Sequence, residues 1–259
     1  MTAAMAMALI LGLLVGILLG LFGGGGSILA VPALVYAVGL PLAAAVPASL
    51  LVVGISAATA VLPRLRQVQW RLAAVFGATG AVAAFGGAAL NRHLDPSVVL
   101  LGFAALMVVA GVRMLRYKGE VGGSCALPGG GVNWRSCLLK AAAAGIVVGF
   151  LTGLFGVGGG FLIIPALVLL LSLPMATAVA TSLVIIVLNS AAGFVAHLGD
   201  TTIDVGIAAT FTVAAIAGSL TAGRFASRLP AARQRRWFAY LVFGVATYVI
   251  IQTLATLLA

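Results

Sequence analysis

Hydroxyl side chains recur at two matched places in a strongly apolar chain. Ser49 stands in the sequence Pro-Ala-Ser-Leu, and Thr181 and Ser182 stand in the similar sequence Ala-Thr-Ser-Leu. Each of these four-residue motifs, which we call the Ser-Leu steps, begins a strongly apolar stretch. A hydroxyl near the start of a helix there can donate a hydrogen bond to an oxyanion. A single Ser or Thr in such a helix more often bonds a preceding carbonyl or packs between helices. For the matched pair both interpretations stay open.

Asn189 adds an amide about two helical turns beyond Ser182, so the two side chains can share one helix face. An amide in the middle of an apolar helix is costly unless it has a partner or a function. Ser56 is the equivalent residue of the first copy. We therefore interpret Asn189 as the best single polar candidate for substrate binding.

A glycine-rich segment precedes each of these steps. The segments 20–34 and 153–167 are identical at 10 of 15 positions, and the same offset relates Ser49 to Ser182. Neither copy continues with the Gly-Lys-Ser/Thr of a phosphate-binding loop, and neither has the strand and acidic residue of a dinucleotide site. Glycine instead allows one helix to end and another to begin inside a membrane.

The start of such a second helix presents unpaired N–H groups and a positive dipole end, which favour an anion. Two hinges brought together from opposite sides would hold an anion near the membrane midplane. Close helix packing is the alternative role of these small residues. The candidate substrate-binding residues of the hinges are Gly23, Gly24, Gly25, Gly26, Ser27, Gly156, Gly158, Gly159 and Gly160.

Four charged or titratable residues near the ends of apolar stretches are candidates for ion coupling or for a vestibule. His197 and Asp200 could relay protons, although solvated loop residues are the simpler interpretation. Arg92 and Arg224 follow similar Gly/Ala-rich stretches and could hold an anion at an entrance or extend to the membrane interface. No acidic residue lies within the core of an apolar stretch, so we expect no carboxylate site for Na⁺ or a metal. No cofactor is expected.

The composition determines the class of protein that must position these residues. Hydrophobic residues make up 63% of the 259 and charged residues only 7%, whereas a soluble domain carries about 25% charged residues. The mean hydropathy is +1.28. The chain therefore needs the lipid bilayer as its solvent. The net charge of +10 lies at the ends of apolar stretches, which indicates topology and not nucleic-acid binding.

Ten apolar elements can be marked. They cover about 4–22, 26–40, 43–62, 71–90 and 96–115, then about 138–155, 159–172, 175–196, 203–222 and 237–258. The second and seventh are shorter than the roughly 20 residues of a full span, and each contains a proline. We expect both to be half-membrane or tilted helices.

The distribution of arginine and lysine favours ten separate elements over the alternative, in which each hinge pair is one span and the chain has eight helices. The basic connections are all odd-numbered, so ten elements place them on one face, which is predicted to be cytoplasmic, with both termini outside. Five elements per half make the two copies inverted relative to each other, a pattern typical of secondary transporters. The predicted fold is an all-α polytopic membrane protein with a first repeat at 1–116, a cytoplasmic linker at 117–136 and a second repeat at 137–259. Cys125 and Cys137, in or beside this linker, are expected to be free thiols, with a redox pair or a metal site as the alternative.

At these residues the chain resembles the TauE/SafE family of membrane permeases, named for export of sulfite and organosulfonates. The resemblance rests on the doubled Gly-Leu-Phe-Gly motif, the following Pro-Ala-Leu, the Ser-Leu step, and Asn189 with the His197-Leu198-Gly199 end. It implies a transporter of small sulfur-containing anions or related carboxylates, driven by an ion or potential gradient. The first copy departs from the pattern at Pro47-Ala48 and Gly26-Ser27.

The functional prediction is a secondary transporter that exports sulfite or an organosulfonate such as sulfoacetate by alternating access across a bacterial cytoplasmic membrane. An anion channel, a permease for another small organic anion and a non-transporting accessory protein are the alternatives. No nucleophile–base pair is visible inside a span, so an enzyme is not expected. Expected partners are the anion, the bilayer, a coupling proton or other ion, and, as one option, a second copy in a homodimer.

Overall fold

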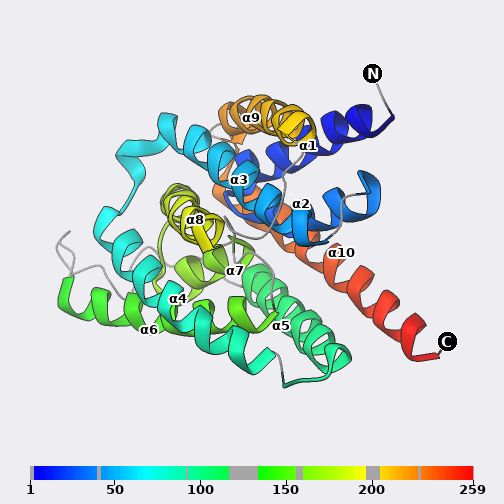
Figure 1. Cartoon of the computed structure of the whole chain (residues 1–259). Coiled ribbons are helices and arrows are strands. Elements are labelled where there is room, and N and C mark those ends of the chain that lie inside the picture. The colour runs from blue at the N-terminus through cyan, green and yellow to red at the C-terminus, as the bar shows by residue number, and fades with distance from the viewer. Residues whose placement is uncertain are drawn as a thin grey trace.

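A computed structural model describes residues 3–39, 42–91, 93–116, 134–155, 160–196, 205–226 and 229–258. These residues contain no strand and form ten α-helices (Figure 1). The helices are α1 (Ala3–Phe22), α2 (Gly25–Pro32), α3 (Leu42–Val61), α4 (Trp70–Asn91), α5 (Pro96–Arg116), α6 (Trp134–Phe155), α7 (Gly160–Pro165), α8 (Met175–Ala196), α9 (Val205–Ala226) and α10 (Ala231–Leu258).

The ten helices confirm the ten elements expected from hydropathy. Within the described residues, seven helices are long and apolar enough to span a membrane: α1, α3, α4, α5, α6, α8 and α9. The start of α10 differs from the prediction, because the helix begins at Ala231 and not at 237. Its first turn forms because the Pro230 carbonyl accepts the N–H groups of Arg233 and Gln234. The arginines of this turn lower its hydropathy without opposing the helix.

Helices α2 and α7 are short, as predicted, and each passes into a π-helical turn. The π turns are η1 (Ala33–Ala37) and η3 (Ala166–Leu170). Each begins directly after the proline, Pro32 or Pro165, that ends the α-helical segment. Proline has no N–H to donate and its ring crowds the preceding turn, so the regular hydrogen-bond ladder is interrupted there. The α-helical segments of eight and six residues are about 12 and about 9 Å long.

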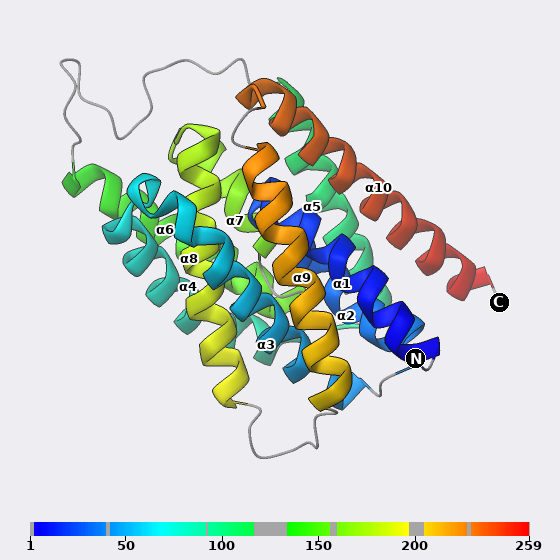
Figure 2. The ribbon, with the colours of Figure 1, turned by 90° about the horizontal axis from the view of Figure 1, so that it is seen from above.

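Two long helix pairs join the halves of the chain, α1 with α9 and α4 with α6 (Figure 2). In the first pair, Gly12, Gly16 and Gly20 of α1 lie against the backbone of Phe211, Ala215 and Ser219 of α9. A methyl group on Gly16 would overlap the Ala215 carbonyl. Only glycine permits this approach of two backbones.

The second pair repeats this arrangement with the other members of the two halves. Gly145, Gly149 and Gly153 of α6 lie against Phe76, Gly80 and Ala84 of α4. The difference in residue number between the two glycine-rich segments also separates the three α6 glycines from the three α1 glycines. A closely similar difference separates the α4 residues from the α9 residues that they match. The internal repeat therefore extends to the contacts between helices. The inverted orientation of the two halves in a membrane stays a prediction.

The remaining helices fill the space between these two pairs. Helix α3 lies between α8 and α9 (Figure 1), and α5 packs along α10. Helix α7 is buried along its whole length, as are most side chains of the first half of α8. The core is thus built around the second hinge helix and the hydroxyl-bearing start of α8.

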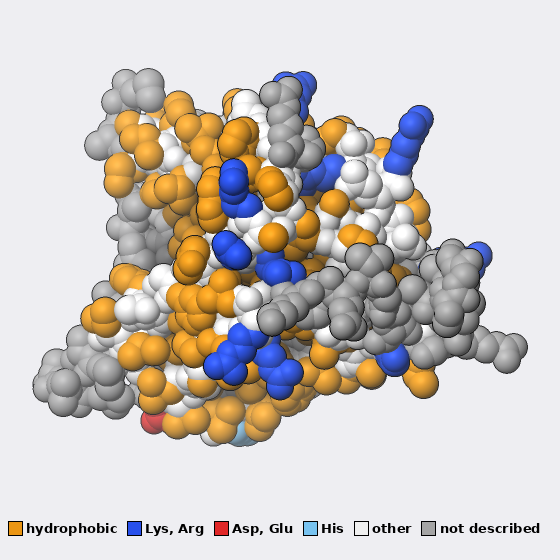
Figure 3. All heavy atoms as spheres, turned by 180° about the vertical axis from the view of Figure 1, so that it is seen from behind, with side chains coloured by type: hydrophobic (Ala, Val, Ile, Leu, Met, Phe, Trp, Pro, Cys, Tyr) orange, Lys and Arg blue, Asp and Glu red, His pale blue; other side chains and the backbone are white. Residues whose placement is uncertain are grey.

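Basic side chains gather on the face of the molecule shown in Figure 3. Within the part of the chain that the structure describes, the exposed arginines and lysine come from the ends of α3, α5 and α9 and from the starts of α4, α6 and α10: Arg66, Arg71, Arg113, Arg116, Lys140, Arg224, Arg233 and Arg236. We call this surface the basic face.

Cys137 is buried near the start of α6 and is disulfide-bonded. The expectation of free thiols is therefore wrong for this residue. Cys125, the other cysteine, lies outside the described residues. Disulfides are rare in a reducing cytoplasm, so the placement of the linker on the cytoplasmic side stays a prediction.

Candidate functional site

The two glycine hinges meet at the start of α2 and α7. A methyl group on Gly24 would overlap the carbonyl of Gly160, and one on Gly160 would overlap the hydroxyl of Ser27. Ser27 is buried and its Oγ donates to the Gly24 carbonyl at 2.8 Å. The structure thus brings a residue of each predicted hinge into backbone contact. Gly156, Gly158 and Gly159 lie outside the described residues.

Gly23 makes the break between α1 and α2. Its φ is +71°, in the left-handed region that favours glycine. Its N–H donates to the Leu19 carbonyl at 2.7 Å and so ends α1. The hydroxyl of Ser182 is shared between the carbonyls of Val179, at 2.9 Å, and Gly23, at 3.3 Å. Ser182, predicted from sequence as a site residue, therefore lies directly on the first hinge. Gly25 and Gly26 are buried in the following turn.

The other polar candidates have separate surroundings. Thr181 is fully buried, and its Oγ1 accepts the N–H of Gln69 at 3.2 Å, immediately before α4. Ser49 is buried in α3. Asn189 is half-buried in α8. Its neighbour Ser190 is buried, and the Cβ of Ser190 would lie 3.1 Å from a methyl group on Gly54 of α3.

A cavity of about 230 Å³ lies on the basic face, where the ends of α3 and α9 meet the starts of α8 and α10. We call it the inner cavity. Its polar lining comes from Arg64, Gln67, Arg224 and Gln234, and no Asp or Glu is among the described residues that line it. Val179, whose carbonyl accepts from Ser182, also lines it. The cavity therefore reaches the helix turn that contacts the first hinge.

Arg64 is the most deeply buried charge among the described residues, with only 8% of its surface exposed. It lies in a 3₁₀ turn, η2 (Leu62–Gln67), that continues α3. Its Nη2 donates to the carbonyls of Gly20, at 3.1 Å, and Gly223, at 3.0 Å. These carbonyls belong to the last turns of α1 and α9, where a cation complements the negative end of the helix dipole.

Gln234 of α10 makes the corresponding contact one residue further along α1. Its Nε2 donates to the carbonyl of Leu21, and its side chain is buried. Arg64 and Gln234 together bind the last carbonyls before the hinge at Gly23. Both side chains also line the inner cavity, so the same two groups fix the end of α1 and face the cavity.

Comparison with known proteins assigns the chain to a family. The family model described as "Sulfite exporter TauE/SafE" matches residues 8–249. The chain belongs to the TauE/SafE family. It is 34% identical over 247 residues to a "Probable membrane transporter protein" of Xylella fastidiosa, with 92% of each chain covered. A "Probable membrane transporter protein YdhB" of Bacillus subtilis is 22% identical over 216 residues, covering 80% of this chain and 84% of its own length. No solved structure matches.

This TauE/SafE protein is a multi-pass membrane transporter by its family and its helices. The family membership agrees with the resemblance carried by the glycine hinges and the Ser-Leu steps. The relatives' names state neither a substrate nor a direction of transport.

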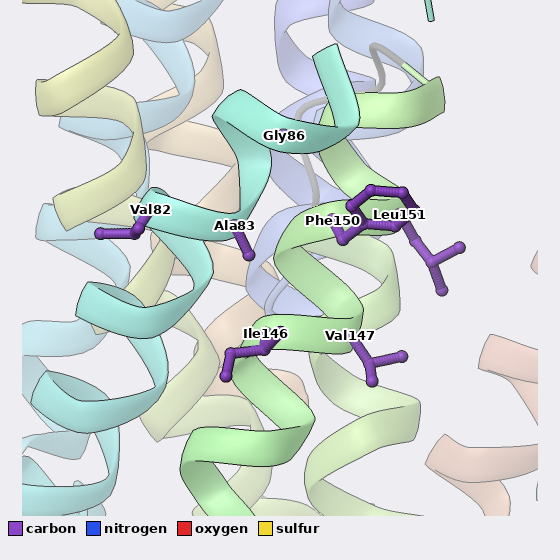
Figure 4. Close-up of a pocket in the computed structure, with 7 residues that line it drawn as sticks. All are labelled: Val82, Ala83, Gly86, Ile146, Val147, Phe150 and Leu151. Atoms are coloured by element: carbon purple, nitrogen blue, oxygen red, sulfur yellow. The ribbon is translucent and has the colours of Figure 1, made fainter. Parts of the chain in front are cut away.

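A larger cavity of about 470 Å³ lies elsewhere, between α4 and α6 (Figure 4). Its lining is wholly aliphatic or aromatic, apart from one glycine: Val82, Ala83, Gly86, Ile146, Val147, Phe150 and Leu151. Val82 and Ile146 are 74% and 51% exposed, as expected for side chains that face lipid. It offers no polar side chain to a ligand, whereas the smaller inner cavity does, so the inner cavity is the candidate site of this transporter.

Arg64 and Gln234 are site residues that no sequence pattern singles out. In the sequence, Arg64 is one basic residue among several in an odd-numbered connection, and Gln234 lies in an arginine-rich stretch. Arg224, a predicted vestibule residue, does line the cavity. Arg92, His197 and Asp200 lie outside the described residues. The Gly-x-x-x-Gly spacing of α1 and α6 was visible in the sequence and is a known signal for close helix contact.

Proposed function

We propose that this transporter exports small sulfur-containing oxyanions, sulfite or an organosulfonate such as sulfoacetate, across a bacterial cytoplasmic membrane by alternating access. The observation that carries the proposal is the inner cavity, whose described lining includes Arg64 and Arg224 and no carboxylate, beside a hinge that interrupts α1. Ionisable groups buried inside membrane proteins generally mark substrate or ion pathways.

The charge and size of the inner cavity support a small anion. Arginine presents several N–H donors in a planar fork that matches oxygen atoms of sulfonate or sulfite geometry. A volume of about 230 Å³ is below the roughly 300–1,000 Å³ of pockets for drug-sized ligands. The two arginines disfavour a cation in the same space, and no described lining residue supplies a carboxylate ligand for one.

The hinges supply the elements that alternating access requires. Helices α1 and α9 form one tightly packed pair and α4 and α6 a second, each joining the two halves of the chain. The two hinges touch between these pairs at Gly24 and Gly160. A rocking motion of one pair against the other would open this contact to one side at a time, as in other repeat-built transporters.

Export follows from the electrical potential if the basic face is cytoplasmic, as the positive-inside rule indicates. The inner cavity would then receive anions from the cytoplasm, and both termini would lie outside. A negative interior favours outward movement of each negative charge by about 2.3 kcal/mol per 100 mV. A coupled proton or other ion would add to this driving force.

The test is efflux from proteoliposomes that contain the purified protein and labelled sulfite, sulfoacetate, sulfate or acetate. We expect saturable efflux of sulfite or sulfoacetate that increases when the potential is made negative inside. An anion channel, the second candidate, would give efflux that rises linearly with concentration. Acetate efflux without sulfite or sulfoacetate efflux would contradict the sulfur-anion assignment.

A further inference from the structure

We propose that Arg64 is the anion-binding residue of an entry site in the inner cavity, through which the substrate reaches the first hinge. The proposal rests on the proposed function and names the residue that would select its substrate class. Arg64 lines the cavity and is more than nine-tenths buried. Its ligand is a small oxyanion with at least two oxygen atoms available to a guanidinium.

The hydrogen bonds of Arg64 account for only part of its guanidinium. Nη2 donates to Gly20 and Gly223, which is the expected role of a cation at the ends of α1 and α9. Nη1 is buried and has no hydrogen-bond partner among the residues that the structure describes. A buried donor left unpaired on a charged group is costly. Helix capping accounts for the hydrogen bonds of Nη2 but gives Nη1 no acceptor. A bound oxyanion would supply an acceptor for Nη1.

The two Nη2 bonds also fix the orientation of the guanidinium. Their acceptors lie on two different helices, α1 of the first half and α9 of the second, so the plane of the guanidinium is held before any ligand binds. Such preorganisation reduces the ordering cost of binding. A lysine could not reproduce it, because its single ammonium lacks the planar fork.

The surroundings of Arg64 connect the entry site to the moving part of the transporter. Gly20 and Leu21, whose carbonyls accept from Arg64 and Gln234, lie in the last turn of α1, before the break at Gly23. Arg224 adds a second positive charge to the cavity wall. An anion bound at Arg64 would therefore lie beside the residues at which α1 ends and α2 begins.

The experiment measures the melting temperature of the purified full-length protein in a neutral detergent, titrated with methanesulfonate at constant ionic strength. Arg64→Gln removes the charge. Arg66→Gln is the matched control, since Arg66 lies in the same turn, is exposed and does not line the cavity. We expect a saturable rise in melting temperature for the wild type and Arg66→Gln, and at least a tenfold higher apparent Kd for Arg64→Gln.

A second variant keeps the proposal testable if Arg64→Gln fails to fold. Ala176→Phe places a large side chain at an exposed position of the cavity lining, at a residue that takes no part in the hydrogen bonds of Arg64 to Gly20 and Gly223. Ala88→Phe, at an exposed position of α4, is its control. We expect Ala176→Phe to lose methanesulfonate binding and Ala88→Phe to keep it.

Methanesulfonate binding retained at the wild-type Kd by either folded cavity variant would overturn the entry site and leave the proposed function standing. No saturable stabilisation of the wild type by methanesulfonate, sulfate or sulfoacetate would overturn both. The neutral detergent separates a free anion from a lipid phosphate. A rise in melting temperature with added phosphatidylglycerol but not with methanesulfonate would assign the cavity to a headgroup and overturn the proposal.

Discussion

The hydroxyl of Ser182 lies 3.3 Å from the carbonyl oxygen of Gly23, and so connects the start of α8 to the hinge of the other half of the chain. The two residues are 159 positions apart. Ser182 belongs to the polar step that follows the second hinge, while Gly23 forms the first hinge itself. A polar group of the second half therefore contacts the break in a helix of the first half, as expected of a transporter whose site lies between two repeats.

Replacing Gly23 by alanine is expected to destabilise the protein by more than the same change at Gly39. Both glycines have positive φ, +71° and +82°, and alanine there costs about 1–2 kcal/mol. A methyl group at Gly23 would also lie 2.9 Å from the Ser182 hydroxyl and the Val179 carbonyl, whereas at Gly39 it meets nothing within 4 Å. Thermal unfolding in detergent measures both; equal melting temperatures for the two variants would contradict the close packing of the hinge.

The two glycine seams, α1 on α9 and α6 on α4, are expected to respond alike to substitution. Gly16→Ala and Gly149→Ala each place a methyl group on a facing backbone carbonyl, of Ala215 and Gly80 respectively. Overpacking of this kind costs about 1–3 kcal/mol. Gly244→Ala on α10 is the control, because its methyl group has nothing within 4 Å and alanine favours the helix by up to about 1 kcal/mol. An unchanged melting temperature for either seam variant would show that its helices do not pack this closely.

Thr181 is expected to act in stability more than in substrate affinity. Thr181→Val removes the acceptor of the Gln69 N–H and should destabilise the protein by about 1–2 kcal/mol, with KM for the transported anion unchanged. Thr181→Ser keeps the oxygen and should restore most of the stability. If Thr181→Val instead raises KM severalfold at an unchanged melting temperature, Thr181 is a substrate ligand, as its sequence position suggests.

Hydropathy and charge were enough to predict the ten helices, since the bilayer requires long apolar stretches with basic ends. The short second and seventh helices followed from Pro32 and Pro165 in the same way. The contact of Gly24 with Gly160 agrees with the expectation that the hinges come together, because matched motifs in a repeat occupy matched places.

The role of Arg64 could not be predicted from its neighbours in sequence. An arginine after an apolar stretch ordinarily extends toward the membrane interface. Whether it turns inward depends on which helix ends lie beside it, and Gly223 is 159 residues away. The partner of Thr181, Gln69, is likewise 112 residues distant. Such contacts arise from packing between the halves and leave no local pattern.

The most direct test of the central claim is counterflow. Proteoliposomes are loaded with unlabelled sulfite or sulfoacetate, and uptake of the same labelled anion is followed from a lower outside concentration. A carrier that alternates between two sides predicts transient accumulation of label above equilibrium, absent from liposomes without protein. Equilibration without overshoot, despite measurable flux, would show an open anion path and contradict alternating access.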